Sequence, residues 1–264
     1  MTQGEIQAAA GALFQAEVSR VQIGLLSLQY PAMTLDDAYG VQAAFVARKL
    51  AAGRRRVGWK IGLTSRAMQE ALKISTPDSG VLLDDMVFQC GARVPAGRLI
   101  QPRVEAEIAF VLKAPLSGAG VTRADVVAAT DYVCPALEIL DTRILRVDPA
   151  TGKARGIVDT VADNAANAGI VLGVSRHPVG DLRWVGAILK RDGVVEETGL
   201  GAGVLDDPVL GIVWLVRRLA GYGMGIAAGE VVLSGAFIRP VEAPAGSRFE
   251  ADFGGFGRVE IGFD

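Results

Sequence analysis

Hydrophobic residues recur at helical spacing through the N-terminal part of the chain, and the pattern then changes to that of strands. Apolar positions three and four residues apart predict one helix over residues 7–28 and a second over 34–52. Pro31 separates the two, because proline cannot continue a helix. Thr34, with Asp37 three residues later, forms a capping-box pattern at the start of the second helix. Residues 1–56 are therefore expected to form an N-terminal helical segment.

Short apolar runs separated by Gly, Pro and Asp fill the rest of the chain, as is typical of strands. They cover residues 57–63, 87–88, 104–112, 132–140, 170–172, 184–191, 231–233, 248–253 and 257–261. Asp192-Gly193 predicts a tight hairpin after the 184–191 run. Helical patterns over 123–130 and 208–219, and a short helix from Thr64 through about residue 72, interrupt the strands. The pattern indicates an α+β fold, with residues 57–264 as one strand-rich unit.

Three glutamates stand on the two longest strand patterns. Glu105 and Glu107 share one face of the 104–112 run, because alternate residues of a strand point the same way. Two like charges side by side repel each other unless a proton or a cation lies between them. Glu138 is the single charge of the 132–140 run, and a buried carboxylate needs a cationic partner. That partner is an arginine, a lysine or a metal ion, and Arg143 is a plausible one that would make Glu138 structural.

Lys60 is the charged residue of the 57–63 run. Gly58 and Gly62 share its strand face, and their lack of side chains lets a ligand approach closely. Lys60 is then either a surface lysine or the polar floor of a cavity. In a cavity, a nearby cation would lower its pKa and suit it to general acid/base catalysis. Three carboxylates without histidine favour Mg²⁺ or Mn²⁺ over zinc or copper.

The composition narrows the classes of chemistry. The 264-residue chain carries a net charge of −2, which argues against nucleic acid as its partner. Its one histidine, His177, lies in a predicted loop and gives little basis for a histidine-built zinc site or a catalytic triad. Cys90 and Cys134 are too few for a disulfide framework and are expected to be reduced. Without a membrane-length apolar run or a signal-peptide pattern, we expect a cytoplasmic protein that does not bind membranes.

Four motifs together resemble the 2-keto-4-pentenoate hydratase / 4-oxalocrotonate decarboxylase family of the fumarylacetoacetate hydrolase superfamily. They are Gly58-Trp-Lys-Ile-Gly-Leu-Thr-Ser65, Gln101-Pro-Arg-Val-Glu-Ala-Glu107, Pro135-Ala-Leu-Glu138 and Asp159-Thr-Val-Ala-Asp-Asn164. The resemblance runs from about Tyr30 to the C-terminus. It implies a fumarylacetoacetate hydrolase-like mixed β-sandwich or roll after the helical segment, and a homo-oligomer. Within the family, three further stretches most resemble hydratases of the homoprotocatechuate meta-cleavage route, namely Leu82-Leu-Asp-Asp-Met86, Val147-Asp-Pro149 and Asp163-Asn-Ala-Ala-Asn-Ala-Gly169.

The resemblance also implies an activity. Family hydratases of this type add water to a 2-oxo-enoic dicarboxylate, 2-oxohept-4-ene-1,7-dioate or its 2-hydroxydiene tautomer, and give 4-hydroxy-2-oxoheptanedioate. The implied metal is Mg²⁺ or Mn²⁺, with Glu105, Glu107 and Glu138 as its ligands. Lys60 and Asp78 are the implied catalytic residues, which move the proton during tautomerisation.

Further residues are implied to contact the substrate. Leu63 and Ser234 match positions near it, and a distal carboxylate would need a positive partner, for which Arg66, Arg103 and Arg239 are candidates. Trp59 departs from the family, whose members carry His or Arg there. Strand alternation should point Trp59 away from Lys60.

Other functions stay open at this point. The same metal site would serve a 2-keto-4-pentenoate hydratase or a 4-oxalocrotonate-type decarboxylase, and the chain could also be a non-catalytic, metal-bound partner of a sister enzyme. A carbon–carbon hydrolase is disfavoured, because such enzymes use a glutamate–histidine dyad and His177 lies away from the motifs. Gly199-Leu-Gly-Ala-Gly203 lacks the strand–loop–helix setting of a phosphate loop, so nucleotide binding is not expected.

Overall fold

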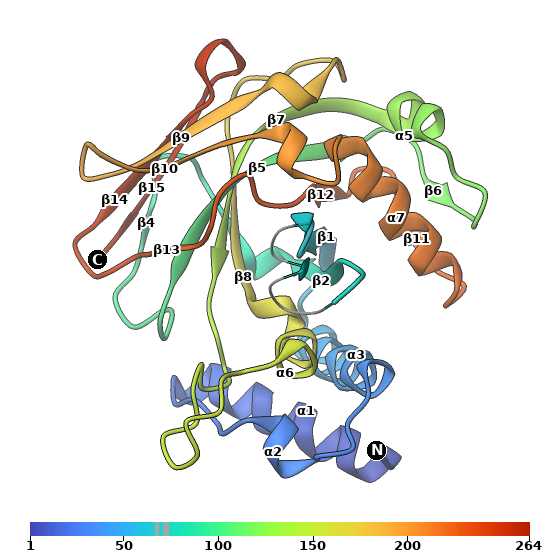
Figure 1. The fold of residues 1–264 in the computed structure, drawn as a ribbon, viewed down its shortest axis with the longest axis vertical. Helices are drawn as coiled ribbons and strands as arrows, with labels where there is room; N and C mark the ends of the chain where they lie inside the picture. Colours follow the sequence, from blue (N-terminus) through green and yellow to red (C-terminus); the bar gives the residue numbers. More distant parts are fainter. Residues whose placement is uncertain (67–68, 71–73) are drawn as a thin grey trace.

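The computed structural model describes residues 1–66, 69–70 and 74–264, and the short helix expected after Thr64 lies partly outside them. Figure 1 shows the N-terminal helices below the strands, together with α6, and shows α5 and α7 beside the upper part of the sheets. No described helix is both long and apolar enough to cross a membrane. The helices are α1 (Gln3–Ser19), α2 (Leu26–Gln29), α3 (Leu35–Ala51), α5 (Arg123–Ala129), α6 (Ile157–Ala162) and α7 (Pro208–Ala220).

The first predicted helix is wrong in its second half. α1 ends at Ser19, because Arg20 adopts a left-handed backbone conformation with φ of 61° that a helix cannot continue. The chain then extends, and Ile23 forms a parallel bridge with Ile144 before the single turn α2. The second predicted helix is confirmed as α3. Thr34 and Asp37 form the expected capping box, each side chain accepting the other's backbone N–H.

The larger sheet contains the strands that carry the acidic motifs. Its order is β2-β1-β12-β5-β7-β8-β3, and β13 also pairs with β5. β5 and β7 pair antiparallel along almost their whole length, whereas β1 lies parallel to β12. The strand bounds are β1 (Arg56–Gly62), β2 (Asp78–Leu83), β3 (Val87–Phe88), β5 (Arg103–Leu112), β7 (Thr130–Leu140), β8 (Asn167–Leu172), β12 (Val231–Leu233) and β13 (Val241–Glu242).

A smaller sheet lies to the left in Figure 1, in the order β10-β9-β14-β15-β4. The expected hairpin joins β9 and β10 through Asp192 and Gly193, whose positive φ angles of 53° and 83° suit a type I′ turn. β6 and β11 pair with each other separately. The bounds are β4 (Arg93–Val94), β6 (Leu116–Ser117), β9 (Gly186–Arg191), β10 (Val194–Leu200), β11 (Gly225–Ile226), β14 (Arg248–Asp252) and β15 (Arg258–Phe263).

Strand β2 is not predicted by the sequence pattern. Asp78-Ser-Gly80 looks like a turn, and all six residues of the strand are buried, so no polar–apolar alternation marks it. β2 nevertheless pairs antiparallel with β1, with Gly62 opposite Asp78. This pairing brings the one acidic residue of β2 to the end of the strand that carries Lys60.

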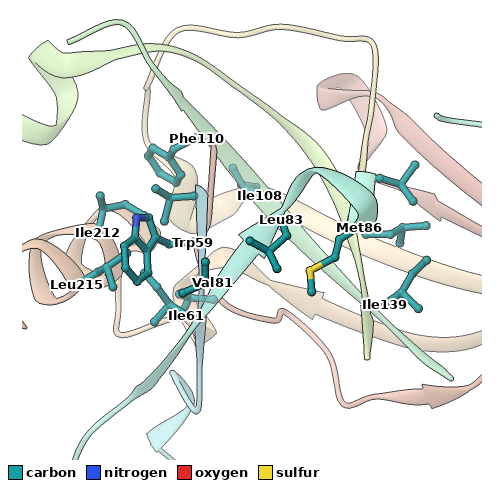
Figure 2. Close-up of a cluster of buried hydrophobic side chains, with 14 of the residues drawn as sticks. Trp59, Ile61, Val81, Leu83, Met86, Ile108, Phe110, Ile139, Ile212 and Leu215 are labelled. Atoms are coloured by element: carbon teal, nitrogen blue, oxygen red, sulfur yellow. The ribbon is translucent and has the colours of Figure 1, made fainter. Parts of the chain in front are cut away.

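The two faces of the larger sheet pack differently. One face belongs to the main core: Figure 2 shows Trp59 beside Ile212 and Leu215 of α7, with Ile61 and Val81 below it. Trp59 therefore points away from Lys60, as strand alternation predicts. The other face has a smaller apolar cluster of its own, made of Leu82, Ala109, Cys134, Ala136, Ile170 and Leu233. The glutamates continue this second face.

Candidate active site

Three carboxylates converge where β5 and β7 pair. The register places Glu105 directly opposite Glu138, and Glu107 opposite Ala136, so the three side chains leave one face of the sheet. One oxygen of each carboxylate lies within 4.8 Å of the others. Glu107 and Glu138 are fully buried, and Glu105 is half-buried. Among the described residues, no other group of three or more His, Cys, Asp or Glu has spacing that suits a metal ion.

Much of the hydrogen-bonding capacity of this carboxylate cluster is free. The backbone N–H of Gly235 donates to Oε2 of Glu107 at 2.8 Å. Oε1 of Glu107 and both oxygens of Glu138 are buried without a hydrogen-bond partner among the described residues. Buried acceptors left unpaired are costly, and hard oxygen donors are the ligands that Mg²⁺ and Ca²⁺ prefer. The cluster therefore fits a divalent cation.

Arg143 is not the partner of Glu138. It donates instead to Asp163, from its backbone N–H at 2.9 Å and from its guanidinium group. Lys60 takes that place, with Nζ 3.4 Å from Oε1 of Glu138. The structural interpretation of Glu138, as the partner of a nearby arginine, is thereby wrong.

Lys60 and Asp78 both extend over Gly62. Both side chains are almost completely buried, and their strands are held in register by the β1–β2 pairing. A Cβ atom on Gly62 would lie 2.2 Å from Oδ1 of Asp78 and 3.0 Å from Nζ of Lys60. Glycine is thus required at this position so that the two charged groups can approach each other. Oδ1 of Asp78 has no hydrogen-bond partner among the described residues and is free to bind a further donor.

The cluster lies just beyond the end of a short strand. β12 separates β1 from β5 but ends at Leu233, one residue before Ser234. The chain then turns at Gly235, where φ is 118° and Thr64 packs so closely that a Cβ atom would lie 2.4 Å from its hydroxyl. The family resemblance pointed to Ser234 but not to its neighbour Gly235, whose backbone N–H donates to Glu107.

Burial and mutual repulsion shift the titration of these groups. Burial, together with the charge of Glu138, raises the pKa of Glu105 to about 8. Burial and the charges of Glu138 and Glu105 raise the pKa of Glu107 well above its ordinary value. Burial by itself would lower the pKa of Lys60, but the charges of Glu138 and Asp78 outweigh it and raise that pKa. Lys60 is therefore protonated beside the carboxylates. The lower pKa expected from the sequence assumed a cation bound next to it.

We expect the metal-free protein to lose stability as the pH rises from about 4.5, the ordinary pKa of glutamate, towards about 8, the pKa of Glu105. A raised carboxyl pKa means that the folded state binds more protons than the unfolded state between these values, so unfolding becomes easier as the protons leave. Added Mg²⁺ should reverse the trend, because it competes with protons for the same oxygens. Urea unfolding across this range, with chelator and with Mg²⁺, measures both. A metal-free stability that rises with pH would contradict the prediction.

Comparison with known proteins adds to this geometry. No protein-family model matches the chain. The chain is 49% identical to the 2-oxo-hept-4-ene-1,7-dioate hydratase of Escherichia coli over 255 residues, which is 95% of each protein. The chain belongs to the 2-keto-4-pentenoate hydratase / 4-oxalocrotonate decarboxylase family. Two of the four motifs that suggested this membership carry the three glutamates, and a third carries Lys60.

Solved structures confirm the fold of this family member. The 4-oxalocrotonate decarboxylase from Pseudomonas putida G7, complexed with magnesium and adipate, matches with a TM-score of 0.93 and 34% identity, covering 100% of this chain and 99% of that one. A fumarylpyruvate hydrolase from Pseudomonas aeruginosa matches at a TM-score of 0.59 and 14% identity, over 79% and 89% of the two chains, and shares the fold alone. The expected α+β, fumarylacetoacetate hydrolase-like fold is confirmed.

Two other residues that the family resemblance implied, Ser234 and Leu63, adjoin the site glycines Gly235 and Gly62 in the sequence. Ser234 is fully buried directly after β12, and its hydroxyl has no hydrogen-bond partner among the described residues. Leu63 directly follows β1 and is half-buried, in a left-handed conformation with φ of 56°. Both belong to the segments that the close contact between Thr64 and Gly235 joins.

The arginines that the sequence suggested for a distal carboxylate differ sharply from one another. Arg66 and Arg239 are exposed, with ion pairs to Asp206 and Glu197 respectively. Arg103 is mostly buried and stands two residues before Glu105 on β5. Arg66 and Arg239 are therefore poorly placed to bind a carboxylate away from water, whereas Arg103 is well placed.

His177 takes no part in the carboxylate cluster. Its backbone bridges to Val133, towards the other end of β7 from Glu138. Its ring stacks on Phe256 with 4.3 Å between centroids, and Nε2 lies 2.8 Å from the Phe256 carbonyl oxygen. These contacts give the histidine a structural role.

Proposed function

We propose that this chain is a divalent-metal-dependent hydratase of 2-oxo-enoic acids, with 2-oxohept-4-ene-1,7-dioate or its 2-hydroxydiene tautomer as substrate. The observation that carries the proposal is the convergence of three glutamates, two of them fully buried, with Lys60 and Asp78 on one sheet face. The 49% identity with a hydratase named for this substrate supports it, against 34% for the solved decarboxylase.

Glu105, Glu107 and Glu138 are proposed to hold the cation, which we take to be Mg²⁺ or Mn²⁺. The free oxygens of Glu107 and Glu138 favour this assignment, and the solved family member is complexed with magnesium. When bound, such an ion supplies positive charge that binds the substrate's 2-oxo acid end and stabilises negative charge developing on the 2-oxo oxygen. Three protein ligands leave coordination positions for substrate and water.

Lys60 and Asp78 are proposed to move the protons. The 2-hydroxy-2,4-diene loses its hydroxyl proton and gains a proton at C5, which gives the conjugated 2-oxo-3-ene. Water then adds across the remaining double bond, its oxygen bonding to C4 and a proton reaching C3, so that 4-hydroxy-2-oxoheptanedioate forms. Lys60 is protonated because of its acidic surroundings, and the free oxygen of Asp78 can accept a proton on the same face of the sheet.

The interior of the site suits an acid with an apolar middle. The face that carries the glutamates continues into small and aliphatic side chains, among them Ala109, Ala136 and Leu233. Such a lining excludes water from the carbon chain while the charged groups hold its ends. The buried hydroxyl of Ser234 is proposed to donate to the substrate carboxylate nearest the cation.

Incubation of the protein with 2-hydroxyhepta-2,4-dienedioate, with Mg²⁺ and then with EDTA, tests the proposed function. We expect loss of the diene absorbance and appearance of 4-hydroxy-2-oxoheptanedioate with Mg²⁺, and no turnover with EDTA. A parallel incubation with 4-oxalocrotonate monitors carbon dioxide. Release of carbon dioxide without any hydrated product would establish the decarboxylase alternative, and no turnover of either acid would leave a non-catalytic partner.

A further inference from the structure

Three arginines beside the carboxylate cluster have buried N–H groups without acceptors. We name Arg103, Arg146 and Arg155 the arginine cluster. Nε of Arg103, Nε of Arg146 and Nη1 of Arg155 are buried and form no hydrogen bond to any described residue. The side chains are only 20%, 29% and 11% exposed, respectively. A buried cation with unpaired donors is costly, so these groups are suited to an anionic acceptor.

Two carboxylates near the arginine cluster, Asp163 and Glu242, already bind other donors or lie too far from the free N–H groups. Nη1 of Arg155 lies 3.9 Å from Oδ2 of Asp163, which is too far for a hydrogen bond. Asp163 itself accepts from the backbone and the guanidinium group of Arg143. Glu242 is 59% exposed and lies 2.5 Å from Nη1 of Arg146, but 4.0 Å from Nε of Arg103.

The nearby ion pairs leave the free donors of the arginine cluster without an acceptor among the described residues. Asp163 and Glu17 pair with Arg143, and Glu17 is shared with Lys49 at 2.6 Å. Glu242 pairs with Arg146, whereas Glu105 acts on Arg103 only through its charge. A further anion would accept from the three free N–H groups.

Arg103 links the arginine cluster to the proposed metal ligands. Arg103 shares its strand face with Glu105, and β13 places Glu242 opposite Arg103. Arg146 and Arg155 come from the loop after β7, the strand of Glu138, and the N–H of Arg155 donates to the carbonyl of Arg146 at 2.9 Å.

A series of contacts leads from Arg155 through Asp163 and Asn164 towards Lys60. Its neighbour Asp163 directly precedes Asn164, whose side chain bonds to the backbone of Val81 on β2. The Asn164 carbonyl oxygen approaches Gly80, which lies opposite Lys60 in the register and against its side chain. Burial raises the pKa of Asp78, and the charge of Lys60 and, more weakly, that of Arg155 oppose it.

We propose that the arginine cluster binds the second carboxylate of a dicarboxylate substrate, with Arg103 and Arg155 as donors and Arg146 as the positioning residue. The assignment rests on the proposed function, because it supplies the distal end of the same substrate. The glutamates with their cation take the 2-oxo acid end, and the guanidinium groups take the far carboxylate in the planar geometry that arginine favours. The cluster thereby selects dicarboxylic over monocarboxylic 2-oxo-enoic acids.

The test compares a diacid with a monoacid in Arg155→Met. With Mg²⁺ present, kcat/KM is measured for 2-hydroxyhepta-2,4-dienedioate and for 2-hydroxypenta-2,4-dienoate. We expect about a 100-fold loss for the diacid, chiefly in KM, and little change for the monoacid, because only the diacid loses a charge-assisted contact. Arg155→Lys should restore part of the loss. Arg183→Met removes an exposed arginine that pairs with Asp181 and serves as the matched control.

Calorimetric binding of adipate and of pentanoate to the Mg²⁺-loaded protein gives a second measurement. Adipate should bind the unmodified chain more tightly than pentanoate, and Arg155→Met should remove that difference. Equal losses on both substrates with an unchanged adipate preference would overturn the assignment, as would a shift of preference in Arg239→Met instead. If the unmodified chain hydrates neither acid, the proposed function fails, and the adipate preference still decides whether the cluster binds a second carboxylate.

Discussion

Replacing Glu107 with glutamine is expected to abolish Mg²⁺ binding while leaving the metal-free protein at least as stable as the unmodified chain. The side chain is fully buried and its Oε1 has no hydrogen-bond partner among the described residues, so its ionised form is poorly compensated and its pKa is raised. Glutamine keeps an oxygen for the Gly235 N–H and offers an amide to the unpaired oxygens of Glu138. The variant thus relieves repulsion in the empty site but removes a ligand from the loaded one.

The measured quantities for Glu107→Gln are the Mg²⁺ dissociation constant, kcat and the free energy of unfolding with and without metal. We expect Mg²⁺ affinity to fall by more than about 100-fold, because replacing a residue that merely hydrogen-bonds to a metal ligand can already have an effect of that size. Turnover should fall by about 1000-fold. Glu260→Gln makes the same chemical change on β15, where the glutamate pairs with Arg248, and should alter neither. A variant that keeps its Mg²⁺-dependent stabilisation would show that Glu107 is not a ligand.

Replacing Lys60 with methionine is expected to separate catalysis from metal binding. Turnover should fall by about 100- to 10,000-fold, the range typical of a lost proton-transfer group. Mg²⁺ affinity should rise, because Nζ lies 3.4 Å from Glu138 and competes with the ion for its charge. The metal-free protein should be less stable, since Glu138 and Asp78 lose the cation that offsets their burial.

Lys190→Met provides the control for that experiment. Lys190 also pairs with a glutamate, Glu250 at 3.2 Å, but on a half-exposed position of β9. Its loss should leave turnover and Mg²⁺ affinity unchanged and cost less than about 1 kcal/mol of stability. If Lys60→Met kept both turnover and its pH profile, proton movement would have to be assigned to Asp78 or to water.

The strands that carry the glutamates could be predicted because their patterns are long and one-sided. On β5, Val104, Ile108 and Phe110 are buried in the main core, and Glu105 and Glu107 face the opposite way, as alternation requires. The convergence of β5 with β7 could not be read from periodicity, which says nothing about which strands pair. The family resemblance supplied that information, and the register confirmed that Glu105 and Glu138 lie opposite each other.

The predictions that were wrong or missing depend on contacts between segments that are distant in the sequence. β2 is buried on both faces, so it lacks the alternation that marks a strand, and its Asp-Ser-Gly start resembles a turn. Arg143 was a plausible partner for Glu138 by proximity along the chain, but Asp163 on the loop after α6 captures it. Arg155 was overlooked, because the signal that distinguishes it is a buried N–H without an acceptor, and no sequence pattern shows that.

The carboxylate cluster stands on two long paired strands, β5 and β7. The arginine cluster comes partly from the loop that joins β7 to α6. A ladder is hard to alter, because a change of register displaces every side chain along it, whereas a surface loop accepts replacement and insertion readily. Descendants of such a scaffold can inherit the reacting centre intact and acquire a new preference by exchanging a few loop residues. Because the reacting centre and the substrate preference would change independently, one fold could act on many different acids of a degradation route.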